Sequence, residues 1–284
     1  VTQKYYPVKN IEVTVDITNG QITMKNSGDG IDIAWHTEEK MYVPELIFGN
    51  LLTGTNFDET EDRTVGGMNG LGAKLINIFS TEFIIETVDA HRGLKYTQRF
   101  LNNMSIREDP IISKYKGVPY TLLSFKPDFK RFGMTSLKDD DTVLLMRKRT
   151  YDIAACTSKE VTVYYNSEKI EIKTFERYVD LYVGSRSQCK RIYTVINPDW
   201  EIAVCASQDG TFEQISFVNG VCTYRGGKHV EHASNIISTR LTKYATENKK
   251  GMSNISAKSI KDNMWIFINT TMVRADLIHK RSEE

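Results

Sequence analysis

Long apolar runs, paired cysteines and an excess of one charge are all missing from this chain of 284 residues. No stretch approaches the roughly 18 apolar residues that a membrane span needs, and the first ten residues lack the apolar core of a signal peptide. We therefore expect no membrane partner. The 37 basic and 36 acidic residues leave a net charge of +1, which gives no whole-chain electrostatic argument for binding nucleic acid.

Cysteine is scarce, and no C-x-x-C pair occurs among Cys156, Cys189, Cys205 and Cys222. Their scattered positions predict reduced thiols in an intracellular protein rather than a disulfide framework or a metal site. The composition is otherwise that of a globular protein, with 40% hydrophobic and 26% charged residues. Such a balance excludes intrinsic disorder and leaves enough apolar surface for a sizeable core.

The first part of the chain mixes hairpins with helices. Residues 11–17 alternate apolar side chains, and Asn19-Gly20 is a strong signal for a hairpin turn into a second strand. Further elements are expected as a helix after Pro44, strands at 82–88, 94–101 and 121–127, a helix over 139–155, and a hairpin around Asn166-Ser167. This order predicts an α+β domain over residues 1–180.

The remainder has a β-β-β-α-β order. Its expected elements are a hairpin over 191–206, a strand over 214–220, an amphipathic helix within 226–247 and a buried strand over 264–269. This pattern predicts a smaller α/β domain over residues 181–284, with the boundary within about ten residues of position 180.

The stretch from Val65 to Ser80 contains four glycines: Gly66, Gly67, Gly70 and Gly72. A P-loop does not fit, because Ala73 separates the last glycine from Lys74 and Leu75 replaces the magnesium-binding hydroxyl. The Rossmann fingerprint also fails at Leu75, and a flexible linker would not run straight into an apolar helical segment. Glycines expose backbone N–H groups to anions, and a helix N-terminus adds donors and a favourable dipole. The stretch therefore predicts a phosphate-covering lid in which Lys74 neutralises a phosphate.

A second glycine cluster, "NSGDG", lies about 40 residues upstream. The short polar side chain of Asn26 could pair with an adenine amino group, while Gly28 and Gly30 would let the backbone pass close to the base. Alone this pattern marks any turn. Its pairing with the downstream glycine stretch makes a nucleotide site the better interpretation.

From these motifs onward the chain resembles a known family. The ordered segments "NSGDGI", "GGMNGLGAKLINIFSTEF", "QISFVNG", "GGKHV" and "MWIFIN" look like the N-terminal ATPase region of eukaryotic-type DNA topoisomerase II, over about residues 8–269. That region belongs to the GHKL ATPase superfamily. The resemblance implies a Bergerat ATP-binding α/β sandwich followed by a smaller, truncated transducer domain.

The resemblance also implies the site residue by residue. Asn26 would read adenine, with Gly28 and Gly30 shaping the base pocket. Thr55 and Asn56 would contact ribose or phosphate, with Gly54 alongside them. The phosphate loop would consist of Gly67, Met68, Asn69, Gly70, Leu71, Gly72, Ala73 and Lys74. The family usually has arginine in place of Met68 and tyrosine in place of Leu71, so one cationic contact would be lost.

The implied activity is that of a nuclear, ATP-hydrolysing topoisomerase with ATP and Mg²⁺ as cofactors. Two copies would dimerise on binding ATP and close a gate around duplex DNA, and hydrolysis would reopen it. DNA would be bound mainly by core domains that are not in this chain. No catalytic residue and no metal ligand is assigned within it, because the family's general-base glutamate is expected upstream of Val1. The Gln-Thr-Lys loop of the family's transducer is also not found.

Two rival interpretations stay open, another GHKL ATPase and a truncated or degenerate nucleotide-binding fragment without turnover. Other motifs are weaker. His229 and His232 lack the spacing of a zinc protease, so we expect structural or surface histidines. Asp139–Asp141 and Arg147–Arg149 are expected to be solvated parts of one helix. The basic loops "SQCKR" and "NKKG" could line a DNA cavity.

Overall fold

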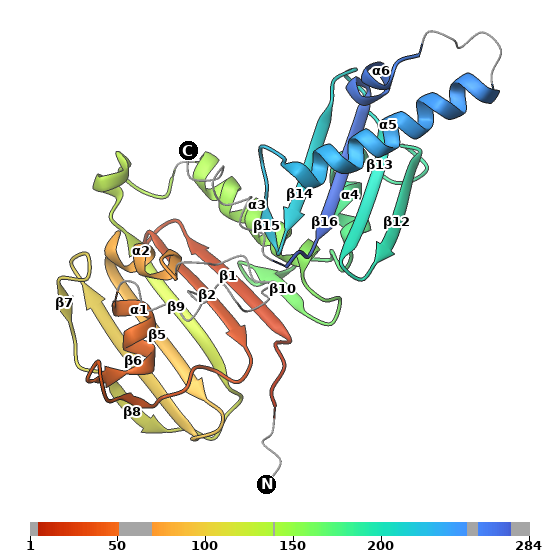
Figure 1. The fold of residues 1–284 in the computed structure, drawn as a ribbon. Coiled ribbons are helices and arrows are strands. Elements are labelled where there is room, and N and C mark those ends of the chain that lie inside the picture. The colour runs from red at the N-terminus through yellow and green to blue at the C-terminus, as the bar shows by residue number, and fades with distance from the viewer. Residues whose placement is uncertain (1–4, 51–69, 139, 249–254, 274–284) are drawn as a thin grey trace. The chain divides into compact units, whose positions relative to one another are not determined.

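The structure is a computed structural model that describes residues 5–50, 70–138, 140–248 and 255–273. The chain divides into two compact units, of which the first runs through Lys173 and the second begins at Thr174 (Figure 1). Each unit has its own sheet. Within the described residues, no helix combines the length and apolar character needed to cross a bilayer.

The first unit is a mixture of strands and short helices around one sheet. Its elements are β1 (Asn10–Asp16), β2 (Gln21–Ser27), β3 (Trp35–His36), β4 (Met41–Tyr42), α1 (Val43–Gly49), α2 (Gly72–Ile78), β5 (Ser80–Asp89), β6 (Leu94–Leu101), β7 (Ile106–Arg107), β8 (Ile111–Lys114), β9 (Tyr120–Pro127), a 3₁₀ turn (Phe129–Phe132), α3 (Asp140–Cys156), β10 (Thr162–Tyr165) and β11 (Glu168–Lys169).

Nine of the described strands form the larger sheet of this unit, in the order β11-β10-β1-β2-β9-β5-β6-β7, with β8 also paired to β6; β3 and β4 form a separate two-stranded sheet. The predicted first hairpin is confirmed, and its turn places Gly20 at a φ of 64°, which glycine adopts without strain. The turn at Asn166-Ser167 is also confirmed, although its second strand is shorter than expected. Strand β1 pairs in parallel with β10, which comes about 150 residues later in the chain.

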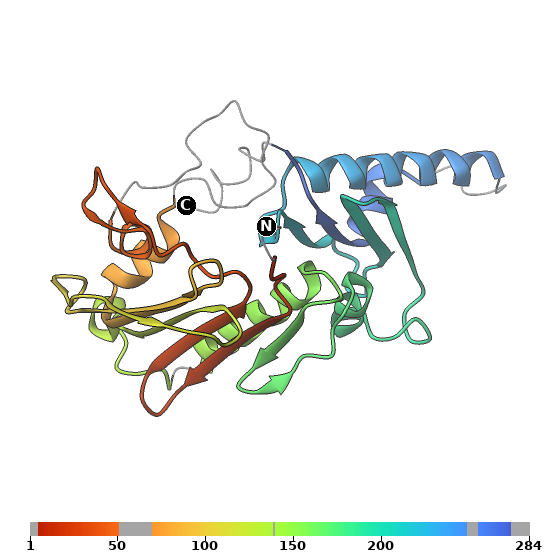
Figure 2. The same ribbon diagram turned by 90° about the horizontal axis from the view of Figure 1, so that it is seen from below.

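The sheet has one apolar and one charged face. Val13, Ile22 and Phe125 lie on the face that α2 and α3 cover, since they line a common apolar cavity with residues of both helices. Figure 2 shows the helices above this face of the strands. The opposite face carries ion pairs such as Lys95–Glu86 at 2.6 Å. This alternation is typical of an antiparallel sheet with one buried face.

The second unit combines a smaller sheet with helices on both faces. Its elements are α4 (Phe175–Val183), β12 (Arg191–Asn197), β13 (Trp200–Ala206), β14 (Glu213–Val218), β15 (Val221–Cys222), α5 (Lys228–Asn248), α6 (Ala257–Asp262) and β16 (Met264–Thr270). The strand order is β12-β13-β16-β14-β15, and β16 runs parallel to β14.

Helix α5 covers one face of this sheet. Val230 and Ala233 pack there against Ile202, Ile266 and Ile268, which are all buried. On the other face, aromatic rings of α4 contact the sheet. Such a two-sided cover explains why the central strand β16 reads as a continuous apolar run in the sequence.

Helix α4 was not expected from the sequence. The predicted second hairpin extended through Phe175, and the predicted domain boundary at residue 180 lies inside this helix. Thr174 caps the helix by accepting a hydrogen bond from the Arg177 N–H. Its buried residues, Phe175, Tyr178, Val179 and Val183, recur with helical spacing, so the missed signal is present in the sequence.

Candidate nucleotide-binding site

Asn26 lies near the end of β2, at the centre of the larger sheet. Its register partners are Ile11 on β1 and Thr121 on β9. Side chains alternate between the two faces along a strand, so Asn26 lies on the same face as Met24 and Ile22. This is the face of the sheet that α2 and α3 cover. Its Nδ2 donates to the Ser27 carbonyl at 3.0 Å. The amide is thereby oriented so that its oxygen can accept a further hydrogen bond.

Threonine hydroxyls continue this row across the sheet. Thr121 is the register partner of Thr87 on β5, and their Oγ1 atoms are 3.0 Å apart. Thr87 is fully buried and also accepts a hydrogen bond from the Ile31 N–H at 2.9 Å. The row places three hydrogen-bonding side chains side by side, with Asn26 as its third member. Sequence analysis missed both threonines, because a hydroxyl on an apolar strand face carries no motif.

The glycine turn after β2 packs tightly on the end of β5. Gly28 and Gly30 have φ values of 141° and 78°. A Cβ on Gly30 would lie 1.8 Å from the carbonyl oxygen of Val88. The Ala90 N–H also donates to the Asp29 carbonyl at 3.0 Å. The second glycine is thus required by backbone packing within the protein, a role that its sequence motif does not reveal.

Asp89 ties the same turn to the sheet from a buried position. Its side chain is 2% exposed and accepts hydrogen bonds from the N–H groups of Ile33, Arg92 and His91 at 2.8–3.0 Å. Burial disfavours the charged carboxylate, but these backbone donors and the charge of Arg92 outweigh burial and hold the pKa of Asp89 below its usual value. The carboxylate therefore acts as an anchor for the segment that follows Asn26.

The predicted helix after the glycine stretch is confirmed as α2, which begins at Gly72. Gly70 precedes it with a φ of 60°, and Leu71 is the N-cap residue. A Cβ built on Gly72 meets no atom within 4 Å among the residues that the structure describes. Nothing described in the protein itself therefore requires glycine at this exposed position.

Lys74 lies inside the unit rather than at its surface. Its side chain on α2 is 2% exposed, and this desolvation lowers its pKa below the usual lysine value. Ala73, its neighbour on α2, is half-buried. A desolvated ammonium interacts more strongly with an anion than a hydrated one does.

Polar side chains fix helix α2 to its neighbours in the first unit. Asn77 is fully buried and donates from Nδ2 to the Phe48 carbonyl at the end of α1, at 3.1 Å. Asn103 donates to the Ile78 carbonyl at 2.9 Å and to Asp128 at 3.1 Å. Helix α2 contacts β5 and β9, so it lies over the sheet face to which Asn26 belongs.

Several expected site residues lie outside the described residues. These are Gly54, Thr55, Asn56, Gly67, Met68 and Asn69. Of the proposed site the structure describes Asn26, Gly28, Gly30 and the segment from Gly70 to Lys74. Both described parts belong to the same face of the same sheet.

An apolar cavity of the first unit does not suit a nucleotide. It has a volume of about 550 Å³ and lies between β1, β2 and β9 of the sheet and helices α2 and α3. Its lining is almost entirely apolar, with Phe129, Met146 and Ile153 among its residues. A triphosphate needs donors and cations, so the cavity differs in chemistry from the row at Asn26.

The weaker motifs have local structural roles. Arg147 lies over the ring of Tyr151, and Lys148 pairs with Asp152 at 2.8 Å along α3. His229 is buried against the Thr223 hydroxyl at 3.2 Å, whereas His232 is exposed. No group of three or more potential metal ligands occurs within the described parts of the chain.

Comparisons with known proteins show the family of the chain. A family model described as DNA gyrase B matches residues 160–276. DNA topoisomerase 2 of Arabidopsis thaliana is 43% identical over 275 residues, which cover 94% of this chain. The chain spans only about a fifth of the length of that relative, 18%.

Two crystal structures align along almost the whole chain. The ATPase region of Saccharomyces cerevisiae topoisomerase II is 42% identical with a TM-score of 0.84, over 94% of this chain and 68% of that one. The ATPase and transducer domains of DNA topoisomerase II from Balamuthia mandrillaris are 37% identical with a TM-score of 0.87, over 94% and 67%. The expected mixed α/β fold of GHKL type is thereby confirmed. The chain therefore belongs to the DNA gyrase B and topoisomerase II family of GHKL-type ATPase regions.

Proposed function

We propose that the first unit binds ATP at the row that begins with Asn26 and that the chain serves as the ATPase region of a type II DNA topoisomerase. The observation that carries this proposal is the shared face of the larger sheet. Asn26 and helix α2, which follows the glycine stretch, both belong to it. The relatives named DNA topoisomerase 2 and the similar ATPase-region structures support the same function.

In this proposal the side-chain oxygen of Asn26 accepts a hydrogen bond from the adenine amino group. Thr121 and Thr87 extend the polar row beside it. The backbone amides before α2 and the ammonium of Lys74 hold the phosphates, with Mg²⁺ as the counterion that the family implies. Gly54, Thr55 and Asn56, together with Gly67, Met68 and Asn69, stay predictions for the ribose and phosphate contacts. Stabilisation of phosphate charge by such donors is the main contribution a protein makes to phosphoryl transfer.

In the intact enzyme, ATP binding would join two copies and close a gate around duplex DNA, and hydrolysis would reopen it. The second unit would be the transducer that relays the nucleotide state. A nuclear location follows from the same proposal. Nucleotide binding is the activity that we assign to the described residues of the first unit.

Binding of a non-hydrolysable ATP analogue with Mg²⁺, followed by calorimetry, tests this proposal. Asn26→Leu removes the acceptor at the base and is expected to weaken binding about 10- to 100-fold, which corresponds to about 1.4–2.8 kcal/mol. The matched control is Gln21→Leu, which makes the same amide-to-leucine change on β2. Gln21 contacts Ser124 on the face of the sheet opposite to that of Asn26. Equal affinity of Asn26→Leu and the parent chain would contradict the base site.

A turnover assay separates the rival functions. ATP binding is expected for these 284 residues, and ATP hydrolysis that is stimulated by DNA would show that they also carry a general base. Failure of the parent chain to bind any nucleotide would favour a degenerate interaction module. Preference for a partner other than DNA would favour another GHKL ATPase.

A further inference from the structure

A groove beside α5 leaves part of the smaller sheet open. Helix α5 crosses the sheet over β16, and β12 lies to the side of the helix (Figure 1). The groove has a volume of about 480 Å³, with strands β12 and β13 as its floor and α5 as its wall. Its lining is almost entirely apolar and includes Ile192, Ile196, Trp200, Ile202, Ile236 and Leu241.

Several apolar side chains of the groove are exposed to solvent. Ile192 is 73% exposed and Ile196 is 61% exposed, and both lie on β12. This strand is the edge of the sheet, and the sequence from Ile192 to Asn197 contains no charged residue. Edge strands usually carry charges that prevent association, and contiguous exposed apolar surface is typical of binding sites. The face therefore has the properties of an interaction surface.

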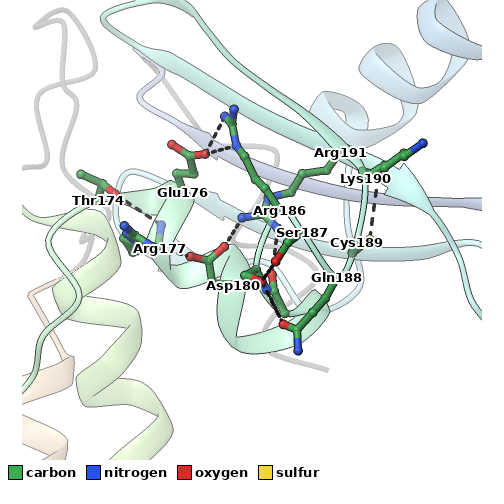
Figure 3. Close-up of polar contacts among 12 residues, drawn as sticks. Thr174, Glu176, Arg177, Asp180, Arg186, Ser187, Gln188, Cys189, Lys190 and Arg191 are labelled. Atoms are coloured by element: carbon green, nitrogen blue, oxygen red, sulfur yellow. Dashed lines mark hydrogen bonds and ion pairs between the residues drawn. The ribbon is translucent and has the colours of Figure 1, made fainter.

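The edge strand under the groove is fixed from its other face. Side chains alternate along a strand, so Arg191 lies on the face opposite to that of Ile192. Arg191 pairs there with Asp180 on α4, as Figure 3 shows, and donates to the Gly184 carbonyl at 2.8 Å. These contacts hold β12 in position before a partner binds. A preorganised surface loses less conformational entropy on binding than a mobile one does.

The width of the floor indicates that the occupant is a helix. Trp200 and Ile202 lie on β13, the second strand from the edge. Two neighbouring strands span about 10 Å, which is also about the diameter of a helix with its side chains. An added strand would pair with β12 and leave Trp200 and Ile202 uncovered. A helix laid beside α5 would cover both strands, with its apolar residues at positions i, i+3, i+4 and i+7.

Charges along α5 indicate the polar side of that helix. His232 and Ile236 line the groove. Arg240 and Lys243 follow Ile236 by four and seven positions, so they lie on the same side of α5, and both are exposed. No acidic residue is found among the described residues that line the groove, although Glu247 lies 3.9 Å from Lys243 further along the helix. The rim of the groove is therefore net positive.

We propose that this groove binds an amphipathic helix of a partner protein. The apolar side of the partner helix lies on β12 and β13, and its acidic side chains lie near Arg240 and Lys243. A second copy of the chain is a poorer fit, because the α5 helix that it could insert carries the same basic side chains. Apolar contacts supply most of the affinity, and the charges favour acidic partners. The surface belongs to the second unit, so the proposal is independent of the nucleotide site.

Binding of a designed peptide to the whole chain tests the proposal. The probe is a fluorescent helical peptide of about 18 residues, or five turns, with leucines on one side and glutamates elsewhere. One control peptide has the same composition with the leucines scrambled over all sides, and another has lysines in place of the glutamates. Fluorescence anisotropy should show saturable binding of the probe, about tenfold or more tighter than that of either control. The methyl NMR signals of Ile192, Ile196 and Ile236 should shift on binding.

Single substitutions locate the bound peptide. Ile192→Asp places a charge in the apolar floor and should weaken binding about tenfold or more. The matched control is Val195→Asp, because Val195 is 54% exposed on the same strand and does not line the groove. This control should bind the probe as the parent chain does. Arg240→Glu combined with Lys243→Glu should reverse the preference, so that the lysine peptide binds more tightly than the glutamate peptide.

Thermal unfolding checks that each variant stays folded, which is expected because all four positions are exposed or on the rim of the groove. Failure of the folded parent chain to bind the probe would overturn the proposal. Equal binding of the scrambled peptide, or an equal loss in Val195→Asp, would overturn it too. Self-association of the nucleotide-free chain that Ile192→Asp abolishes would show that a second copy covers the groove, and would overturn the assignment to a partner protein.

Discussion

Gly30 and Val88 are in such close contact that a Cβ on the glycine would lie 1.8 Å from the valine carbonyl oxygen. Gly72 differs in this respect, because a Cβ at that position would meet no atom of the described residues within 4 Å. Gly30 is thus required by the packing of the protein itself, whereas Gly72 could be required by a bound ligand. Substitutions at these two positions therefore allow effects on folding to be measured separately from effects on nucleotide binding.

Gly30→Ala should destabilise the first unit by about 3 kcal/mol or more, because the backbone must move and alanine disfavours a φ of 78°. Gly72→Ala should leave the unfolding midpoint unchanged or slightly raised, since alanine is the better helix former. It should nevertheless weaken ATP binding if the phosphates approach this backbone closely. Thermal unfolding and calorimetry on both variants provide the measurement. Parent-like affinity in Gly72→Ala would argue against that close approach.

Lys74→Met should weaken ATP binding by roughly tenfold or more. Methionine keeps the length of the buried side chain and removes its charge. In the parent chain, affinity should fall as pH rises through the lowered pKa of Lys74, because only the ammonium attracts phosphate. The variant should lose this pH dependence. Titrations between pH 7.5 and 10 would check both expectations, and an identical slope in the two proteins would contradict them.

Asp89→Asn should destabilise the first unit by about 2 kcal/mol, since a carboxylate that accepts three backbone hydrogen bonds is replaced by a neutral amide. The native pKa of Asp89 is lowered, so its stabilisation is complete above the unfolded value of about 3.9 and is lost as pH falls through the native pKa. Urea unfolding at pH 7 and at pH 3 measures both effects. Asp32→Asn is the control, because its pair with Arg92 at 2.7 Å is exposed to solvent and should contribute little to the free energy of unfolding.

His229→Gln should make the second unit less sensitive to mild acid. Burial lowers the pKa of His229, so the folded state binds its proton less readily than the unfolded state does. Stability is then highest above the unfolded value of about 6.5 and declines as pH falls below it. Unfolding of the second unit between pH 5 and 7.5 provides the measurement. His232→Gln, at an exposed position three residues later, should keep the decline of the parent chain.

Local chemistry explains why much of the fold could be predicted from the sequence. The turn at Asn19-Gly20 and the alternation through Val13 and Val15 depend on neighbouring residues only, and both were correct. Ile17, expected on the same buried face, lies beyond the end of β1 and is exposed. Helix α4 was missed although its periodicity is visible, because the preceding strand pattern was continued too far.

Properties that depend on distant contacts could not be predicted. The need for glycine at position 30 arises from the backbone of β5, nearly 60 residues away. Lys74 is 2% exposed, whereas a lysine in a sequence normally suggests exposure. The hydroxyl row of Thr87 and Thr121 exists only once β5 and β9 are paired.

The parallel pairing of β1 with β10 has a consequence for how the chain is made. The Val15 N–H donates to Asn166 at 2.7 Å, across 151 positions of sequence. Ribosomes add about 5–20 residues per second, so one edge of β1 stays unpaired for roughly 8–30 s until β10 has been synthesised. During that time an unpaired strand edge is available to other nascent chains. Yield in the cell should therefore depend on translation speed and on chaperones that shield this edge.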